Sequence, residues 1–356
     1  MAGGIFLAHT VLAGPFSITN RQYLNPIFQT QADAALNQLE NDINKNMDLS
    51  IADDFLSAMA NAGALTGKGM TVDYASNPEL FSVGGAISVG IYSKGGLNNA
   101  AFNDAFATST SNVSLPAIGA AITAAGNIGV SLQKFKLNKI GFFDPSKLSA
   151  YFSFFSVSQQ IDKVNLGTTS VGLHAVYKVL DPWAPSFKFG KYVFNWGGLD
   201  VNTGFDYISQ KLIFERTFQQ ATAGNSSGTG VFVAWDPKGT LGAKTGIFSI
   251  PFEVSTNVQI LYILSLYTGL GLDINMGSSD SIVTLEGPLT GTNATLGQVF
   301  SGYAKLDLGE SAIPTTLTLR PFFGLQVNIS LLKVFAQMNL TTNSTYGFQA
   351  GLRVAY

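Results

Sequence analysis

Cysteine is absent from this chain, which excludes disulfide bonds, thiol catalysis, thiolate metal sites and lipid attachment to an N-terminal cysteine. Charged residues are scarce as well: they make up 12% of the sequence, whereas soluble domains usually carry about 25%. With a net charge of −2, the chain also lacks the basic surface that nucleic-acid binding requires. Hydrophobic residues nevertheless reach 46%, and this combination indicates a lipid environment.

Long apolar runs are also missing. A transmembrane helix needs roughly 18 or more nearly uninterrupted apolar residues, and the best candidate, 258–274, is interrupted by Gln259, Thr268 and Asp273. An apolar chain without apolar helices can still cross a membrane as a closed barrel, because neighbouring strands satisfy every backbone polar group. We therefore predict an all-β fold, a transmembrane antiparallel β-barrel.

The first part of the chain differs from the rest. Residues 5–14 are apolar, but no Lys or Arg precedes them, so the basic start of a secretory signal is missing and we interpret the chain as mature. Between Pro26 and Leu49, the apolar spacing predicts a helix with Leu36, Leu39 and Ile43 on one face. A second short helix is predicted at 52–62, between Ser50 as its cap and Gly63 as its stop. We expect residues 1–78 to be a partly helical plug or periplasmic hatch, and residues 79–356 to form the barrel.

After Pro78 the hydrophobic period changes from 3.6 to 2. At the C-terminus, alternate positions form one unbroken apolar face that consists of Tyr346, Phe348, Ala350, Leu352, Val354 and Tyr356. The runs are about 10–13 residues long, which suits a tilted strand that crosses a bilayer. About 20 residues per strand and connection predict 12 to 14 strands. The Gly/Thr-rich stretch 287–297 is expected to be an outer loop or a folded insert.

Charges in these runs fall on the polar face, which must point into the lumen because a Lys or Arg facing lipid costs roughly 2–4 kcal/mol at mid-membrane. Large apolar residues share this face, so the lumen is expected to be a partly apolar conduit or to pack against the N-terminal segment. The candidates for lining the lumen are His174, Asp200, Asp206, Lys305, Asp307, Arg320, Phe322, Lys333 and Phe335.

The last eight residues alternate and end in an aromatic residue, which resembles the C-terminal insertion signal of bacterial outer-membrane barrels. The resemblance implies that the barrel-assembly machinery is a partner during biogenesis. Physically, an edge strand with a flat apolar face can pair with another strand edge. The positions that we assign to this signal are Gln349, Gly351, Val354 and Tyr356.

A second resemblance rests on the helical segment followed by Asn77-Pro78-Glu79 and the first strand. This is similar to the outer-membrane fatty-acid and hydrocarbon transporter (FadL-type) family, in which an N-terminal hatch and an Asn-Pro-Ala element precede a 14-stranded barrel. Glu79 replaces the alanine of that element. The resemblance implies passive transport of small, partly hydrophobic solutes.

No zinc spacing, phosphate loop or dinucleotide fingerprint occurs, and neither His9 nor His174 has a recognisable Ser or Asp partner in sequence. We therefore predict no enzymatic activity, no cofactor and no metal site. The predicted function is an outer-membrane channel for small solutes in a Gram-negative-type bacterium. The alternatives are a general diffusion porin and a non-transporting barrel that acts as an adhesin or binding scaffold. The sequence leaves the solute and the oligomeric state open.

Overall fold

The computed structural model describes residues 16–46, 49–76, 78, 80–93, 118–135, 137–141, 143–186, 190–217, 220–224 and 230–356. The apolar N-terminus at 5–14 and two positions of the transporter-like element, Asn77 and Glu79, lie outside these residues. The chain divides into two compact units, each described by itself. The first comprises residues 1–49, 213–242 and 281–309, and the second comprises 50–212, 243–280 and 310–356.

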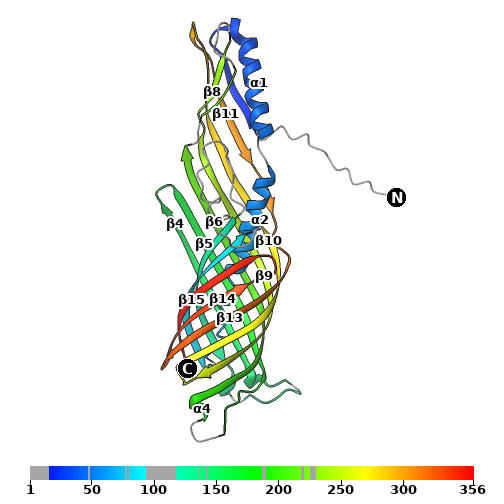
Figure 1. Cartoon of the computed structure of the whole chain (residues 1–356), viewed down its shortest axis with the longest axis vertical. Coiled ribbons are helices and arrows are strands. Elements are labelled where there is room, and N and C mark those ends of the chain that lie inside the picture. Colours follow the sequence, from blue (N-terminus) through cyan, green and yellow to red (C-terminus); the bar gives the residue numbers. More distant parts are fainter. Residues whose placement is uncertain are drawn as a thin grey trace, which may run out of the picture. The chain divides into compact units, whose positions relative to one another are not determined.

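The second unit contains a closed antiparallel ring of hydrogen-bonded strands (Figure 1). Its first and last strands pair with each other, from Ser82 opposite Ala355 to Tyr92 opposite Thr345. This closure confirms the predicted barrel and its closing pair. In ring order the strands are β2 (Phe81–Ser93), β3 (Ile118–Ser131), β4 (Leu148–Ile161), β5 (Val164–Leu180), β6 (Phe194–Thr217), β9 (Lys238–Ile260), β10 (Leu264–Asn293), β13 (Leu317–Ile329), β14 (Leu332–Leu340) and β15 (Thr345–Ala355).

The described ring therefore has ten strands, fewer than the predicted 12 to 14. The length argument overestimated the number because β6, β9 and β10 are 24, 23 and 30 residues long, and each contributes residues to both units. For the stretch 287–297, expected to be an outer loop or a folded insert, the loop alternative is wrong, and the stretch belongs to the first unit. Most of it continues β10 as far as Asn293, because Gly and Thr also occur in long regular strands.

Side chains alternate along the ring strands as the sequence pattern predicts. On β13, the apolar Leu319, Phe323 and Leu325 are exposed on the outside, while Arg320 and Phe322 are buried on the inside. The same alternation on β15 exposes Phe348 and Leu352. Soluble proteins rarely expose contiguous apolar surface of this extent. The outer wall therefore contacts lipid, and the ring is a transmembrane β-barrel of the outer-membrane type.

The hairpin turns follow the sequence in two places. Ser330 and Ser344 adopt positive φ angles of 56° and 62° in the turns that join β13 to β14 and β14 to β15. Both turns lie in stretches that contain Asn and Ser, Asn328-Ile329-Ser330 and Thr342-Asn343-Ser344. Polar residues with short side chains tolerate the left-handed conformation there better than branched ones. The shorter connecting elements are η2 (Gln133–Phe135), η3 (Pro145–Lys147), α4 (Gly190–Val193) and β12 (Ser311–Ala312), the last paired with β10.

The first unit is a sheet with a helix packed on it. In sheet order it contains β1 (Phe16–Tyr23), β11 (Gly297–Leu308), the C-terminal part of β10, β8 (Phe232–Trp235) and β7 (Ala221–Gly224). A short turn, η1 (Pro26–Phe28), leads into α1 (Gln29–Asn46). Leu36 and Leu39 on α1 are fully buried in one apolar cluster with Trp235 and Phe300. These leucines are thus covered by the sheet of their own unit, and the assignment of residues 1–78 to a plug or periplasmic hatch stays a prediction.

The second helix, α2 (Leu49–Thr66), belongs to the barrel unit from Ser50 onward. We call residues 50–76 the inner segment, because its contacts include residues of all ten ring strands and it therefore lies inside the ring. The contacted wall residues include Ala86 and Gly90 (β2), Gly119 and Ala125 (β3), Tyr151 (β4), Val176 (β5), Asp206 (β6), Ala243 and Ile247 (β9), Tyr267 (β10), Phe322 (β13), Phe335 (β14) and Arg353 (β15).

Small side chains let α2 fit within a narrow ring. Ala58, Ala60, Ala62 and Ala64 are all buried, so the helix is enclosed on every side rather than on one stripe. Among the described residues, no helix is long and apolar enough to cross a membrane.

Candidate functional site: a charged barrel interior filled by residues 50–76

Six of the predicted lumen residues lie buried inside the ring: His174, Asp200, Asp206, Arg320, Phe322 and Phe335. Lys333 also lies on the inward-facing side of β14 but is half-buried, and its ammonium group donates to the Ser330 carbonyl at 2.6 Å. Strand alternation alone was sufficient to find these side chains. The charged ones avoid lipid only on the inward face, and Phe322 and Phe335 share that face.

The expectation that Lys305 and Asp307 line the lumen is corrected by the structure. Both lie on β11, which is not a ring strand, and they form an exposed ion pair with each other at 2.9 Å. The sheet of the first unit has a helix on one face and an exposed polar face, so it shows the same alternation as a barrel strand. Alternation therefore could not separate the two cases.

Lys68 is the main charge that the inner segment brings to the wall. Its Nζ atom donates a hydrogen bond to Ser249 Oγ at 2.6 Å and lies 3.2 Å from Asp206 Oδ2 and 3.8 Å from Asp273 Oδ1. The Lys68 residue is only 1% exposed. A buried ammonium group is tolerated only when it is paired and hydrogen-bonded, and these three wall groups supply that environment.

Arg320, fully buried on β13, links the carboxylates of two other strands. Its guanidinium forms a bidentate pair with Asp273, at 2.7 Å and 3.2 Å, and also pairs with Glu253. The remaining Nη1 donates to Asn339 at 3.0 Å. The planar fork of arginine suits such bidentate contacts, so Arg320 on β13 is joined to β9 and β10 by ion pairs and to β14 by a hydrogen bond.

The end of the inner segment makes two further polar contacts. Asp73 Oδ1 lies 2.9 Å from Arg353 Nη1 on β15, and the Tyr74 hydroxyl donates to Glu253 Oε2 at 2.6 Å. The Arg353 guanidinium also lies 4.0 Å from the centre of the Phe335 ring, a favourable cation–π contact. Asp73 therefore takes part in a charge pair with the last strand of the ring.

His174 has a partner at each ring nitrogen. Nε2 lies 2.9 Å from Asp206 Oδ1, and Nδ1 lies 3.3 Å from Asn202 Oδ1. With both nitrogens occupied, neither is directed at a serine hydroxyl as a catalytic base would be. Within the described ranges, no group of three or more His, Asp or Glu residues could hold a metal ion.

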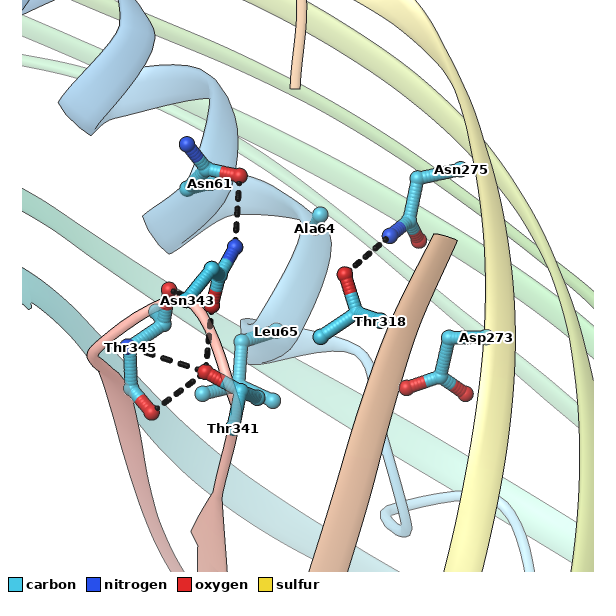
Figure 2. Close-up of a pocket in the computed structure, with 9 residues that line it drawn as sticks. All are labelled: Asn61, Ala64, Leu65, Asp273, Asn275, Thr318, Thr341, Asn343 and Thr345. Atoms are coloured by element: carbon cyan, nitrogen blue, oxygen red, sulfur yellow. Dashed lines mark hydrogen bonds between the residues drawn. The ribbon is translucent and has the colours of Figure 1, made fainter. Parts of the chain in front are cut away.

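The interior has a very small cavity near one set of strand ends and a larger one near the other. Where α2 meets the β14–β15 turn, Asn61 accepts a hydrogen bond from Asn343 at 2.9 Å, beside Leu65 and Thr341 (Figure 2). The cavity there is about 10 Å³, room for one water molecule at most. Near the opposite strand ends, a cavity of about 320 Å³ is lined by Asp73, Ser131, Gln133, Ser149, Tyr151, Lys178 and Asp200, among others.

Outside the spanning strands, the larger cavity is bordered by Lys147, whose ammonium group pairs with Asp181 at 2.7 Å. The hydrogen bond to Asp181 raises the pKa of Lys147. Deeper in the cavity, Lys178 pairs with Asp200 at 2.9 Å. Charges of both signs therefore line this hollow.

Sequence reasoning missed Glu253, Asp273, Lys68 and Asp73 as interior residues. Glu253 could have been found, because Phe252 and Val254 beside it are exposed and the alternation continues through Ser255 and Asn257. Lys68 and Asp73 lie outside any strand, so no alternation could reveal them.

The predicted assembly positions lie on and after β15. Gln349 is buried inside the ring and Gly351 is half-buried, while Val354 and Tyr356 are exposed. The Tyr356 backbone donates to the Phe81 carbonyl at 2.9 Å, and its ring centre lies 6.1 Å from that of Phe81. The role of these four positions in assembly stays a prediction.

Several solved outer-membrane proteins are distantly similar in structure. The translocator domain of autotransporter NalP from Neisseria meningitidis is 11% identical, with 91% of this chain and 98% of that chain covered, at a TM-score of 0.31. The transport unit of autotransporter AIDA-I from Escherichia coli is 9% identical, covering 84% and 98%, at 0.33. The toluene transporter TodX from P. putida is 7% identical, covering 84% and 99%, at 0.26. Scores this low carry no inference about function.

The sequence itself is more informative about family. No curated protein matches it. A family profile, in contrast, spans nearly the whole chain. Residues 16–356 match the Lsa36-like family, and the chain belongs to that family.

Proposed function

We propose that this protein is an outer-membrane transport barrel whose passage is closed by its own inner segment, and that small polar solutes cross when this segment moves out of the ring. One observation carries the proposal: the inner segment is held to the wall by ion pairs and hydrogen bonds at Lys68, Asp73 and Tyr74. The same segment also packs against the wall through small apolar clusters around Met70 and Val72.

The polar character of this contact supports a movable segment. Buried ion pairs contribute little net stability compared with well-packed apolar side chains. Charged groups on the wall, such as Asp206 and Arg320, can be hydrated once the segment leaves, whereas an apolar wall would be exposed to water at a cost. A permanent filling gains nothing from this arrangement, but a displaceable one does.

The wall also bears on the class of solute. The sequence pattern favoured small, partly hydrophobic solutes. Behind the inner segment, however, the wall contains Asp206, Glu253, Asp273 and Arg320, together with the aromatic Phe322. Buried charges of this density favour solutes that hydrogen-bond over apolar solutes, since an apolar solute would leave the charged groups unpaired.

Planar-bilayer conductance tests the proposal. The Lys68→Gln/Asp73→Asn double variant removes two of the charges that hold the inner segment, so it should open more often than the wild type, which should be mostly closed. The matched control is Lys305→Gln/Asp307→Asn, which removes an exposed ion pair on β11 outside the ring. It should behave like the wild type.

Equal silence of wild type, double variant and control, with all three folded by heat-modifiability on a gel, would refute transport. The second candidate would then gain support, a non-transporting barrel that serves as a surface scaffold. A specific observation favours it: the first unit has its own hydrophobic core around Leu36, Trp235 and Phe300, which a simple channel does not need.

A further inference from the structure

The wall around Lys68 Nζ carries more negative than positive charge. Two carboxylates, Asp206 and Asp273, converge there, with Glu253 beside them. The wall residue Arg320 pairs with Asp273 and Glu253. His174 contacts Asp206 from the other side. The Lys68 ammonium group therefore supplies a positive charge that the wall itself lacks.

The wall surrounds this ammonium group in the way that a binding site surrounds a ligand. Lys68 follows the end of α2, and its Nζ atom contacts the wall, where Ser249 accepts a hydrogen bond at 2.6 Å and Asp206 at 3.2 Å. Ser249 in turn donates to Asn275 Oδ1 at 2.5 Å, which directs its remaining lone pairs toward Lys68. The wall side of the contact is thus organised by residues that do not belong to the inner segment.

We propose that the wall group formed by Asp206, Asp273 and Ser249 is a binding site for a primary ammonium group, occupied by Lys68 in the closed barrel and by small amines in the open one. The role in solute choice rests on the proposed function, because it requires the inner segment to move. The hydrogen-bond acceptors of the site favour a primary over a quaternary ammonium, since a quaternary ion has no N–H to donate to Ser249 or Asp206.

Occupation of the same site by solute and by Lys68 has a consequence for gating. An amine that enters the site competes with Lys68 and so favours the open state. A ligand shifts such an equilibrium only by its differential affinity for the two states, and here the closed state offers the amine no vacant site. Small amines should therefore both open the barrel and bind along its passage.

The first test is chemical rescue. Lys68→Ala removes three carbons and the ammonium group, and n-propylammonium replaces these atoms. Thermal unfolding in detergent should shift upward for Lys68→Ala with n-propylammonium chloride, compared with tetramethylammonium chloride or NaCl at equal ionic strength. Wild type and Lys305→Ala, in which Lys68 competes for the site, should show a smaller shift. An equal shift in all three proteins would overturn the proposal.

The second test uses wild-type protein and does not depend on the variant folding. In planar bilayers, n-propylammonium should raise the open probability in a saturable manner, and tetramethylammonium should not.

Asp206→Asn, introduced into Lys68→Gln/Asp73→Asn, should lower the cation-to-anion permeability ratio, which Asp307→Asn should leave unchanged.

The outcomes separate the two proposals. Conductance by the double variant without rescue or amine opening would overturn the ammonium site and leave transport intact. Rescue of Lys68→Ala without conductance in any protein would support the site and refute transport. Absence of rescue, amine opening and conductance would refute both.

Discussion

At the scale of single residues, the interior charges differ greatly in how much they should matter. Arg320 is fully buried and pairs with two carboxylates. Arg21, in contrast, lies 3.6 Å from Asp33 with both side chains more than a third exposed. Water screens the second pair but not the first, so the same type of substitution should have unequal effects.

Arg320→Met should lower the free energy of unfolding of the barrel by about 3–5 kcal/mol, because Asp273 and Glu253 would remain buried without their partner. The measurement is unfolding in detergent, followed by heat-modifiability. Arg21→Met, the control, should change stability by about 0–1 kcal/mol. A change for Arg320→Met as small as that of the control would show that water enters the interior and screens these charges.

At the scale of elements, the contact between α2 and the wall depends on two glycines. A Cβ atom on Gly119 of β3 would lie 2.1 Å from the Ala58 carbonyl carbon, and one on Gly90 of β2 would lie 2.4 Å from the Ala62 carbonyl oxygen. Backbone atoms cannot yield as flexible side chains do, so the helix itself would have to move. These positions allow α2 to lie directly against β2 and β3.

Gly119→Ala should therefore displace α2 from the wall, lower the midpoint of thermal unfolding and raise conductance. Gly126→Ala is the matched control, because it lies on the same strand but faces outward, and its Cβ would meet only the Phe154 carbonyl oxygen at 3.5 Å. If Gly119→Ala matches the wild type in both measurements, α2 is not held against this wall in the membrane.

The two helices also show the limit of pattern reading at this scale. The spacing of Leu36, Leu39 and Ile43 predicted α1 and its apolar stripe, and the structure has a helix there with these residues buried or partly buried. Which surface covers the stripe was not predictable, because any apolar face would satisfy it. The alanine-rich α2 has no such stripe, and its enclosure by the wall follows only from the ring around it.

At the scale of the whole molecule, ring closure depends on the end of the chain. Tyr356 pairs through its backbone with Phe81, where its carbonyl accepts from the Leu80 and Phe81 amides at 2.8 Å and 3.1 Å. The aromatic side chain adds a contact with the Phe81 ring at 6.1 Å. The last residue therefore contributes to closure in two separable ways.

Tyr356→Ser should reduce the amount of folded barrel in the membrane while keeping the backbone pairing, if the terminal aromatic side chain is read during assembly. The measurement is the heat-modifiable fraction in isolated outer membranes. Phe348→Ser is the control, since it removes an exposed aromatic from the same strand. Equal losses for both variants would mean that only lipid-facing aromatic area matters and would argue against a terminal signal.

The sequence by itself determined which side of each strand carries the polar residues. Alternation is local, and a charge placed on the wrong face would be penalised wherever the strand lies, so Arg320, His174 and Asp206 were assignable to an interior face from their neighbours alone. Only the tertiary structure decided which strands close the ring. Long-range pairing leaves β11, with Lys305 and Asp307, in the other unit. It also brings Lys68 to Asp206 and Asp273, 138 residues and more apart along the chain. Such contacts depend on the pairing partner, and no local pattern records it.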